Sequence, residues 1–339
     1  MRKRKGAGRP TIADVANKAG VSTITVSRAL RDPSMVSDHL RRKINNAVRK
    51  LNYVPHSHAS ALASTRSNII GVIVPSLTNN VFAESLRAIY DAFGQGAFQV
   101  QLGNSRYVPA EEERLVRTFL GQRPSAMIVA GTDQTDVTRQ LLENAECPVV
   151  QIMDVGDDPI DMIVGFSHFE GGKAAGLHLV QQGYKRIGFL GARMDPRSYR
   201  RLEGFKEALQ FGGRSDPDLI MTTTLSSSVS LGAELIGQFC ARRPDLDAVF
   251  CNNDDMALGA LFGCQKAGLS VPDDIGIIGF NDLEMMAAAH PSLTSIRTDR
   301  YAIGRHAVEM IQSVLSGETP DKKIVDLGFE LQVRQSTSR

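Results

Sequence analysis

The first fifty residues alternate apolar and polar positions with the period of an α-helix. Apolar residues recur at i, i+3, i+4 and i+7 in the first segment: Ile12, Val15, Ala16 and Ala19. Thr11 with Asp14 resembles a capping box before them, and Gly20 predicts a sharp turn after them. A second short helix is expected after Ser22 and a third over about 37–51. The pattern therefore predicts three short helices with a tight turn between the first two.

Such an arrangement is typical of a helix-turn-helix domain, which places the start of its second helix in the major groove of DNA. In the second helix Val26, Ala29 and Leu30 are expected to face inward, which leaves a polar face outside. A small structural bundle is the alternative interpretation. We expect the outward face and the capping positions to contact DNA: Thr11, Ser22, Thr23, Ile24, Thr25, Ser27 and Arg28.

From residue 68 onward the pattern changes to short apolar runs rich in Val and Ile, separated by amphipathic stretches. Such runs predict parallel strands whose two faces are covered by helices. Roughly ten strands over the rest of the chain exceed one doubly wound sheet, so an α/β core of two parallel-sheet subdomains is expected. These runs include 68–75, 98–105, 126–131, 148–154, 162–167, 186–192, 248–255 and 275–282.

Polar residues cluster where these apolar runs end. In open α/β sheets the carboxyl ends of the strands border the ligand crevice. Each residue alone could instead be a helix cap or a turn former, but their repetition favours a two-lobed binding cleft. These residues are Ser76, Asn104, Asp154, Asn253, Asp254, Asn281 and Asp282, and we expect all of them except Asp254 and Asp282 to contact the ligand.

The charge is divided unevenly between these two parts. Residues 1–66 carry 14 Lys and Arg against 3 Asp and Glu, whereas the remainder carries 25 against 34. A compact basic head is typical of nucleic-acid binding, because contacts to the phosphate backbone supply most of the non-specific affinity. The overall formal charge of +2 hides this division.

Several classes of protein are disfavoured by what the sequence lacks. No apolar run reaches the length of a membrane span, and the polar N-terminus does not resemble a secretory signal, so a cytoplasmic protein is expected. Its four cysteines lack metal-ligand spacing and are interpreted as reduced thiols. No P-loop, G-x-S-x-G or H-E-x-x-H motif occurs, and no dinucleotide fingerprint follows the first strand of the core.

The seven histidines are scattered along the chain. His168, His290 and His306 are interpreted as capping or surface residues rather than as a catalytic set. A metal site at the closely spaced His56 and His58 is disfavoured. We therefore expect no enzyme activity, no cofactor and no metal.

The head resembles a known family at specific motifs. The segment D-V-A-x-x-A-G-V-S-x-x-T-V-S-R-A-L, followed by L-N-Y-V-P and A-S-A-L-A-S, is similar to the head and hinge of the LacI/GalR family of bacterial repressors. The resemblance implies a hinge at 55–67 that becomes helical on operator binding and inserts Leu62 into the minor groove. It adds Tyr53, His56 and Ala59 to the expected DNA contacts. His56 and Ser60 depart from the usual hinge pattern.

The resemblance extends through the core and implies its organisation. A periplasmic-binding-protein-like core would occupy 68–339, behind a DNA-binding domain at 1–54. Its N-subdomain would span about 68–166 and 297–326, and its C-subdomain about 167–296 and 327–339, with crossovers near 166–168, 295–298 and 325–328. A homodimer on a pseudo-palindromic operator is implied. The segments V-P-S-L-T-N-N-V-F-A-E and L-G-A-R-M-D-P-R most resemble repressors of gluconate utilisation.

The charge of the expected cleft points to an anionic ligand. Asn281 stands where the family commonly has a carboxylate, and Arg201 matches the family's ligand-binding arginine. Arg197 lies one helical turn earlier, and Arg300 stands where an apolar or aromatic residue is frequent. Since arginine pairs bidentately with carboxylates, this charge favours an anionic ligand. Together with the resemblance to gluconate repressors it predicts a gluconate-like sugar acid, with Phe82 against its carbon chain and Asp154 and Asn253 bonding its hydroxyls.

The same residues allow other interpretations. Arg197 and Arg300 could form salt bridges with Asp195 and Asp299 outside the cleft. The ligand could be a neutral sugar, or a corepressor rather than an inducer. A carbohydrate-binding protein without DNA regulation is a further alternative, which the helix-turn-helix spacing disfavours.

Overall fold

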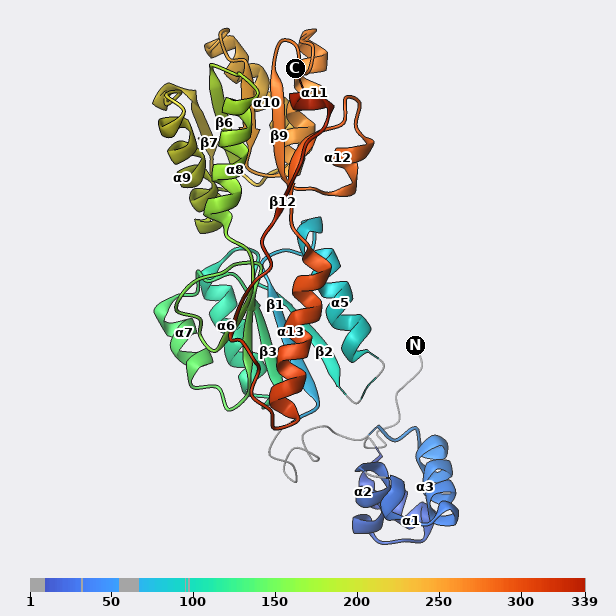
Figure 1. Cartoon of the computed structure of the whole chain (residues 1–339). Coiled ribbons are helices and arrows are strands. Elements are labelled where there is room, and N and C mark those ends of the chain that lie inside the picture. The colour runs from blue at the N-terminus through green and yellow to red at the C-terminus, as the bar shows by residue number, and fades with distance from the viewer. Residues whose placement is uncertain (1–9, 32, 55–66, 95, 97, 339) are drawn as a thin grey trace. The chain divides into compact units, whose positions relative to one another are not determined.

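The computed structural model describes residues 10–31, 33–54, 67–94, 96 and 98–338, and the chain divides into two compact units, 1–67 and 68–339 (Figure 1). We call the first the head and the second the core, and each is described by itself. Within the described residues, no helix combines the length and apolar character needed to cross a membrane.

The head contains the three predicted helices: α1 Ile12–Ala19, α2 Thr23–Arg31 and α3 Asp38–Leu51, with the short 3-10 helix η1 Pro33–Met35 between the last two. The capping box at Thr11 and Asp14 is present in both directions. Gly20 adopts the left-handed conformation, φ 62°, which lets its N–H bond the last carbonyls of α1 and turns the chain toward α2. The helices enclose one apolar core: Val15, Ala16, Ala19, Val26, Ala29, Ile44, Ala47 and Tyr53.

The first lobe of the core is a six-stranded parallel sheet in the order β11-β5-β4-β3-β1-β2. Helices α5 and α13 pack together on one face, and α6 and α7 lie on the other (Figure 1). The elements are β1 Ile69–Val74, η2 Asn80–Phe82, α5 Ala83–Phe93, β2 Gln99–Asn104, α6 Pro109–Leu120, β3 Ala126–Ala130, α7 Asp136–Glu143, β4 Val149–Ile152, β5 Met162–Gly165, α13 Arg300–Leu315 and β11 Ile324–Asp326.

The second lobe repeats this design with the order β12-β10-β9-β8-β6-β7, in which only β12 runs antiparallel to its neighbour. Helices α8 and α9 form one pair, and α10 and α11 form another. The elements are α8 His168–Gln181, β6 Ile187–Ala192, α9 Pro196–Phe211, η3 Pro217–Leu219, β7 Ile220–Thr223, α10 Val229–Arg242, β8 Ala248–Cys251, α11 Asp254–Ala267, β9 Gly276–Asn281, α12 Glu284–Ala288, β10 Thr294–Arg297, β12 Glu330–Gln332 and η4 Gln335–Thr337.

The predicted fold class is confirmed, with a refinement in the number of strands. The described residues form twelve strands, because the three-residue strands β11 and β12 pair at sheet edges without an apolar run. These two strands also show how the chain crosses between the lobes, since β11 joins the first sheet and β12 the second. The strands β1, β3, β8 and β9 are buried along their whole length, as their apolar runs predict.

Helices α8 and α9 approach each other closely through glycine. A Cβ atom on Gly172 would collide with the backbone carbonyl of Arg201, and one on Gly204 would collide with the carbonyl of Phe169. The missing side chains therefore bring the N-terminal half of α8 against α9. This contact places the first residue of α8, His168, beside Arg201.

We expect Gly172→Ala to destabilise the core by about 1–3 kcal/mol, because the added methyl group must push the two helices apart. Gly237→Ala in α10 is the matched control, since a Cβ there meets open space. Alanine exceeds glycine in helix propensity, so the control should be neutral or stabilised by up to about 1 kcal/mol. Urea unfolding of the two variants measures both values. Equal stabilities would contradict the close approach.

Candidate ligand pocket and nucleic-acid interface

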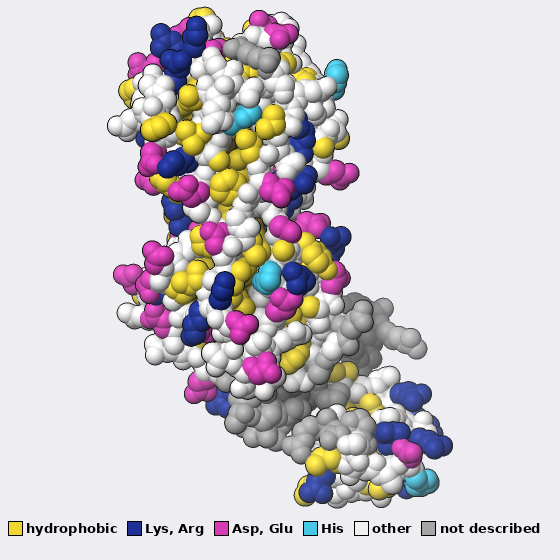
Figure 2. Space-filling view, in the orientation of Figure 1, with side chains coloured by type: hydrophobic (Ala, Val, Ile, Leu, Met, Phe, Trp, Pro, Cys, Tyr) yellow, Lys and Arg dark blue, Asp and Glu magenta, His cyan; other side chains and the backbone are white. Residues whose placement is uncertain are grey.

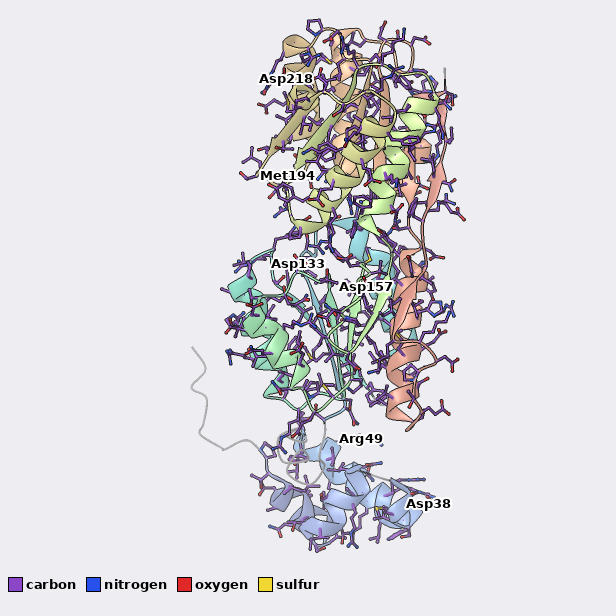
Figure 3. The ribbon with its side chains drawn as sticks, turned by 60° about the vertical axis from the view of Figure 1, so that its left-hand side comes forward. Asp38, Arg49, Asp133, Asp157, Met194 and Asp218 are labelled. Carbon is purple, nitrogen blue, oxygen red and sulfur yellow. The ribbon has the colours of Figure 1, made fainter. Side chains whose placement is uncertain are left out.

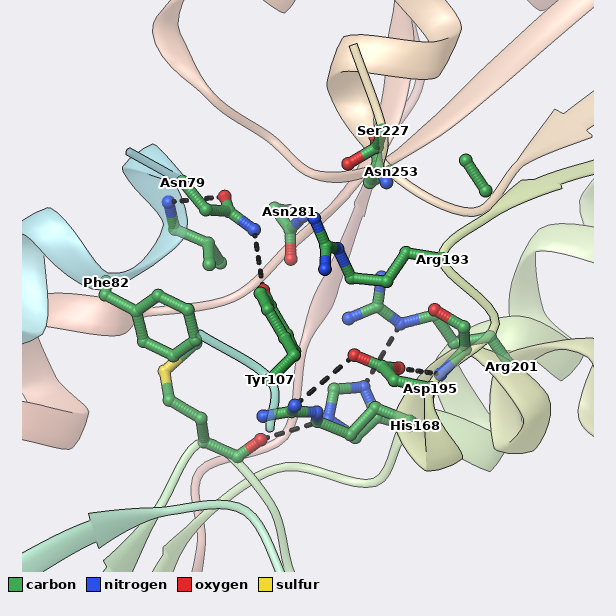
Figure 4. Close-up of a pocket in the computed structure, with 15 residues that line it drawn as sticks. Asn79, Phe82, Tyr107, His168, Arg193, Asp195, Arg201, Ser227, Asn253 and Asn281 are labelled. Atoms are coloured by element: carbon green, nitrogen blue, oxygen red, sulfur yellow. Dashed lines mark hydrogen bonds and ion pairs between the residues drawn. The ribbon is translucent and has the colours of Figure 1, made fainter. Parts of the chain in front are cut away.

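A pocket lies between the two lobes of the core, where strands of both sheets end (Figure 4). The first lobe contributes the loops after β1, β2 and β4. The second lobe contributes α9, the start of α8, the end of β9 and the segments at the ends of β6, β7 and β8. Its lining residues are Asn79, Val81, Phe82, Tyr107, Met153, His168, Ala192, Arg193, Asp195, Arg197, Ser198, Arg201, Ser227, Asn253 and Asn281.

Arg201 is a buried cation of this lining that two hydrogen bonds and an aromatic ring hold in place. It is only 8% exposed, and its guanidinium carbon lies 3.7 Å from the ring centroid of Phe280. Nε donates to His168 Nδ1 at 3.2 Å, and Nη1 donates to the carbonyl of Asn252. Burial, with the nearby charge of Arg197, lowers the pKa of Arg201 to about 10, so the side chain stays charged at neutral pH.

Arg197 lies one helical turn before Arg201 and faces the same pocket. Its Nη2 donates to Asp195 Oδ2 at 3.3 Å. Burial opposes the charge on Arg197, but the carboxylates of Asp195 and Asp133 outweigh it and raise the pKa above its ordinary value. The expected alternative of a salt bridge with Asp195 is thus observed, but inside the pocket rather than outside it.

Arg193 and Tyr107 join the two lobes at the edge of the pocket. The guanidinium carbon of Arg193 lies 4.3 Å from the ring centroid of Tyr107, a cation–π contact. Tyr107 also accepts a hydrogen bond from Asn79 Nδ2 at 3.3 Å. A second opening on the far side of these residues is bordered by Asp133 of the first lobe and Met194 of the second, both labelled in Figure 3.

The pocket lining carries three guanidinium groups against one carboxylate. That carboxylate, Asp195, already accepts hydrogen bonds from Arg197 and from the backbone N–H of Ser198. Burial disfavours its charge, yet Arg197 and the Ser198 hydrogen bond hold its pKa below the ordinary value. The lining therefore has an excess of positive charge, which favours an anionic ligand.

Asn281 supplies a polar atom without a partner. The side chain is 4% exposed, and Oδ1 makes no hydrogen bond within the described part of the chain. A buried acceptor of this kind costs free energy until a donor reaches it. Asn253 and the buried ring of Phe82 also border the pocket. Five predicted ligand contacts thus line one cavity: Phe82, Arg197, Arg201, Asn253 and Asn281.

Four other residues predicted to contact the ligand lie outside this lining, because each is occupied elsewhere. Ser76 Oγ accepts from the N–H groups of Thr78 and Asn79, and Asn104 Oδ1 accepts from the N–H of Arg106. Both side chains stabilise local turns. Asp154 and Arg300, the other two, have partners that connect distant parts of the core.

Asp154 is 1% exposed and forms an ion pair with Arg200 at 2.6 Å. It also accepts a hydrogen bond from Thr132, so it links the first lobe to α9 of the second. Arg300 Nη1 donates to the carbonyls of Asn281 and Thr298, its buried Nε has no hydrogen-bond partner in the described structure, and no ion pair with Asp299 is formed there. Neither residue lines the pocket: Asp154 is buried in its ion pair, and Arg300 lines a separate cavity with Glu84 and Asp299.

Sequence reasoning missed several residues of the lining, namely Asn79, Tyr107, Met153, His168, Arg193 and Asp195. The interpretation of His168 as a capping or surface residue was wrong: the ring is 2% exposed, and Ser167 caps α8 instead. Arg193 and Asp195 lie in the segment L-G-A-R-M-D-P-R, which was noted only as a resemblance. Tyr107 follows the end of β2 in a left-handed conformation, φ 58°, which no apolar pattern predicts.

The head presents an exposed face at α2. Ile24 is 63% exposed, and the side chains of Thr23, Ser27 and Arg28 are also exposed. Ser22 and Thr25 bond each other at the start of the helix, at 2.8 Å. An exposed hydrophobic residue beside hydroxyl and guanidinium groups suits the edges of base pairs in a major groove.

Four of the predicted DNA contacts follow α2 in the chain and are not part of its exposed face. Tyr53 is 7% exposed because its ring packs in the apolar core of the head, so its main contact is with protein. His56, Ala59 and Leu62 lie outside the described residues. Lys and Arg side chains are spread over the drawn face of the head (Figure 2), and the exposed ones are Lys18, Arg28, Arg42, Lys43, Arg49 and Lys50.

Comparison with known proteins gives matches along nearly the whole chain. Residues 11–56 match the family described as bacterial regulatory proteins, lacI family, and residues 177–337 match a periplasmic binding protein-like domain. The HTH-type transcriptional regulator GntR of Pseudomonas aeruginosa is 42% identical over 97% of this chain and 96% of its own length. The regulator of the same name from Escherichia coli is 38% identical over 95% and 97%.

Solved structures agree with these matches. A Lacl family transcriptional regulator from Silicibacter pomeroyi is 35% identical with a TM-score of 0.92, over 97% of this chain and all of the other. The lac repressor dimer bound to operator and an anti-inducer is 28% identical with a TM-score of 0.79, over 97% and 99%.

A helix-turn-helix head joined to a two-lobed binding core defines a DNA-binding transcriptional regulator and not an enzyme. The chain belongs to the lacI family of bacterial regulatory proteins.

Proposed function

We propose that the protein is a cytoplasmic repressor of carbohydrate catabolism, which binds a pseudo-palindromic operator as a homodimer and responds to gluconate or a related sugar acid. The observation that carries the choice of ligand is the excess of guanidinium groups in the pocket between the lobes. The similarity of the chain to the GntR regulators supports the same choice.

In this proposal the carboxylate of the sugar acid meets Arg201 and Arg197. Arginine recognises carboxylates with two parallel hydrogen bonds, which gives both affinity and orientation. A hydroxyl of the ligand donates to the unpartnered Oδ1 of Asn281, a second one meets Asn253, and Phe82 packs against the carbon chain. Asp154 acts behind the pocket through its ion pair with Arg200.

Titration calorimetry with gluconate and glucitol tests the ligand class. The two compounds share a carbon chain and differ in the carboxylate, so their difference in affinity isolates the charge. We expect gluconate to bind at least about tenfold more tightly, since a charge-assisted hydrogen bond contributes about 1.5–3 kcal/mol. Tighter binding of glucitol or of a neutral hexose would contradict the proposal.

Contacts between the lobes supply a route from ligand to DNA. The Arg200–Asp154 ion pair and the Arg193–Tyr107 contact both require the lobes in this relative orientation. A ligand that favours this orientation shifts the population of lobe arrangements, and the affinity for DNA changes with it. Release from the operator by the ligand is the proposed sign, and a gel shift with and without gluconate measures it. Stronger retention would identify a corepressor.

We also propose the domain limits predicted from the sequence: a DNA-binding domain at 1–54, a hinge at 55–67 and a core at 68–339. The division into units 1–67 and 68–339 supports a hinge at 55–67. The membership of β10 and β12 in the second sheet, and of β11 in the first, supports crossovers near 295–298 and 325–328. The subdomains are therefore discontinuous in sequence.

Arg28→Ala should weaken operator binding by about 1–3 kcal/mol and relax the preference for one base pair, because its exposed guanidinium is proposed to contact a guanine. Arg49→Ala is the control, since an exposed arginine at the end of α3 would contact only phosphates. It should weaken operator and random DNA equally. Fluorescence anisotropy with both DNAs gives, for each variant, the ratio of its affinity for the operator to its affinity for random DNA. If Arg28→Ala left this ratio unchanged, Arg28 would have no part in base recognition.

A further inference from the structure

His168 lines the pocket at the point where the chain enters the second lobe. It begins α8 directly after the chain has crossed from β5 of the first lobe into the second. Its ring centroid lies 4.6 Å from that of Phe166 and 6.1 Å from that of Phe280, and those two rings lie 6.1 Å from each other, so the three rings form one cluster. The ring therefore lies at the junction of the two lobes (Figure 4).

The hydrogen bonds of the ring fix its tautomer. Nε2 lies 3.0 Å from the carbonyl oxygen of Met153, which can only accept, so Nε2 carries a proton. Nδ1 faces Nε of Arg201 at 3.2 Å, and a guanidinium nitrogen can only donate, so Nδ1 is unprotonated. The ring is thus neutral.

The charged groups around the ring agree with this assignment. Burial, with the guanidinium groups of Arg201, Arg197 and Arg200, places the pKa of His168 well below its ordinary value. Both ring nitrogens are occupied, so His168 has no atom left to hydrogen-bond a ligand directly. It acts instead on the orientation of its neighbour.

That neighbour, Arg201, is one of the three cations that line the pocket. Arg201 has its Nε bound to His168 and its Nη1 bound to the carbonyl of Asn252, whereas Nη2 makes no hydrogen bond within the described residues. Two fixed nitrogens define the plane of the guanidinium group. The carbonyl that holds the other side of the imidazole, Met153, follows β4 of the first lobe. The chain of hydrogen bonds therefore runs from the first lobe to the cation of the second.

We propose that His168 is a positioning residue for effector recognition: its neutral ring orients Arg201 toward the ligand's carboxylate and ties that orientation to the approach of the two lobes. This inference rests on the proposed sugar-acid effector. When the lobes separate, the Met153 contact breaks and the ring no longer holds Arg201. Effector affinity is then highest in one arrangement of the lobes, as allosteric control requires.

Three substitutions separate positioning from simple packing. His168→Phe keeps an aromatic ring beside Phe166 and Phe280 but removes both hydrogen bonds, and it should weaken gluconate binding by about tenfold. His168→Gln supplies an amide that donates and accepts, and it should retain most of the affinity. If the phenylalanine variant bound gluconate as tightly as the wild type, the ring would be only a packing element.

A double-mutant cycle with Arg201→Lys tests whether His168 acts through Arg201. Lysine has no Nε–H at the position that His168 contacts, so His168→Phe should change gluconate affinity by less than about twofold in that background. Additive losses would overturn the proposal.

A measurement without ligand keeps the inference separate from the choice of effector. Nitrogen NMR of the histidine-labelled full-length protein should show His168 with Nε2 protonated and Nδ1 unprotonated from about pH 6 to 8, where exposed histidines titrate. An imidazolium or the opposite tautomer would overturn the positioning role even if gluconate binds. If the wild type binds no sugar acid but shows the expected tautomer, the proposed effector is wrong and the His168–Arg201 interaction stands.

Discussion

Arg201→Lys should weaken gluconate binding by about 2–3 kcal/mol, roughly 30- to 150-fold, while binding to operator DNA in the absence of effector stays unchanged. Lysine keeps the positive charge but cannot form the fork that meets a carboxylate with two hydrogen bonds. It also loses the bond from Nε to His168 and the stacking over Phe280. Arg201→Ala should abolish measurable binding, because the carboxylate would then be buried without its main partner.

Calorimetry with the gluconate and glucitol pair gives the decisive comparison for this variant. The preference for gluconate should shrink in Arg201→Lys, since the substitution acts on the carboxylate and not on the hydroxyls. Arg186→Lys is the matched control: Arg186 belongs to the same lobe, but its side chain is 55% exposed and pairs with Asp245. It should bind gluconate as the wild type does. An equal loss in both variants would point to a general effect on the lobe.

The pattern of hydrophobic positions was sufficient to predict the architecture, because the spacing of buried residues along the chain differs between helices and strands. Apolar positions at helical spacing gave the head, and short runs of β-branched residues gave strands that are buried on both faces. The pattern could not reveal β11 and β12, whose residues are partly exposed and pair over three positions only. Edge strands of this length are held by tertiary contacts and not by local sequence.

The candidate site was predicted only in part, because the sequence indicates where strands end but not where the side chains at those ends point. Ends of parallel strands meet at one edge, so Asn253 and Asn281 reach the pocket as expected. The same rule cannot say whether a strand-end side chain points into the cavity or bonds its own loop, as Ser76 and Asn104 do. The role of Asp154 could not be predicted from its strand, because its partner Arg200 lies 46 positions away and is brought near only when the two lobes pack.

Asp254 illustrates the same difficulty with a larger energetic consequence. Its position after β8 suggested a polar group aimed into the cleft, but the side chain is completely buried. Oδ2 accepts from the N–H of Leu283 at 2.7 Å, and Oδ1 accepts from the hydroxyl of Ser295 at 2.7 Å. The carboxylate at the start of α11 is thus bonded to Leu283, which follows β9, and to Ser295, which belongs to β10.

Burial, with a smaller contribution from the charge of Asp282, raises the pKa of Asp254 from its ordinary 3.8 to about 7. The native state then binds this proton more tightly than the unfolded chain does. The contribution of Asp254 to the free energy of unfolding is greatest below about pH 4 and decreases as the pH rises to about 7. At about 1.4 kcal/mol for each pH unit, the decrease is on the order of 4 kcal/mol.

Asp254→Asn should remove this pH dependence. Asparagine has nearly the same shape, keeps an acceptor for the Leu283 N–H, and presents its NH₂ group to the oxygen of Ser295, whose hydroxyl can rotate. Because the neutral amide has no proton to lose, the variant should be more stable than the wild type at pH 8 and no more stable at pH 4. Urea unfolding of both proteins across this range measures the difference. Parallel curves would show that Asp254 stays ionised in the folded core and that its two hydrogen bonds, not burial, determine its charge.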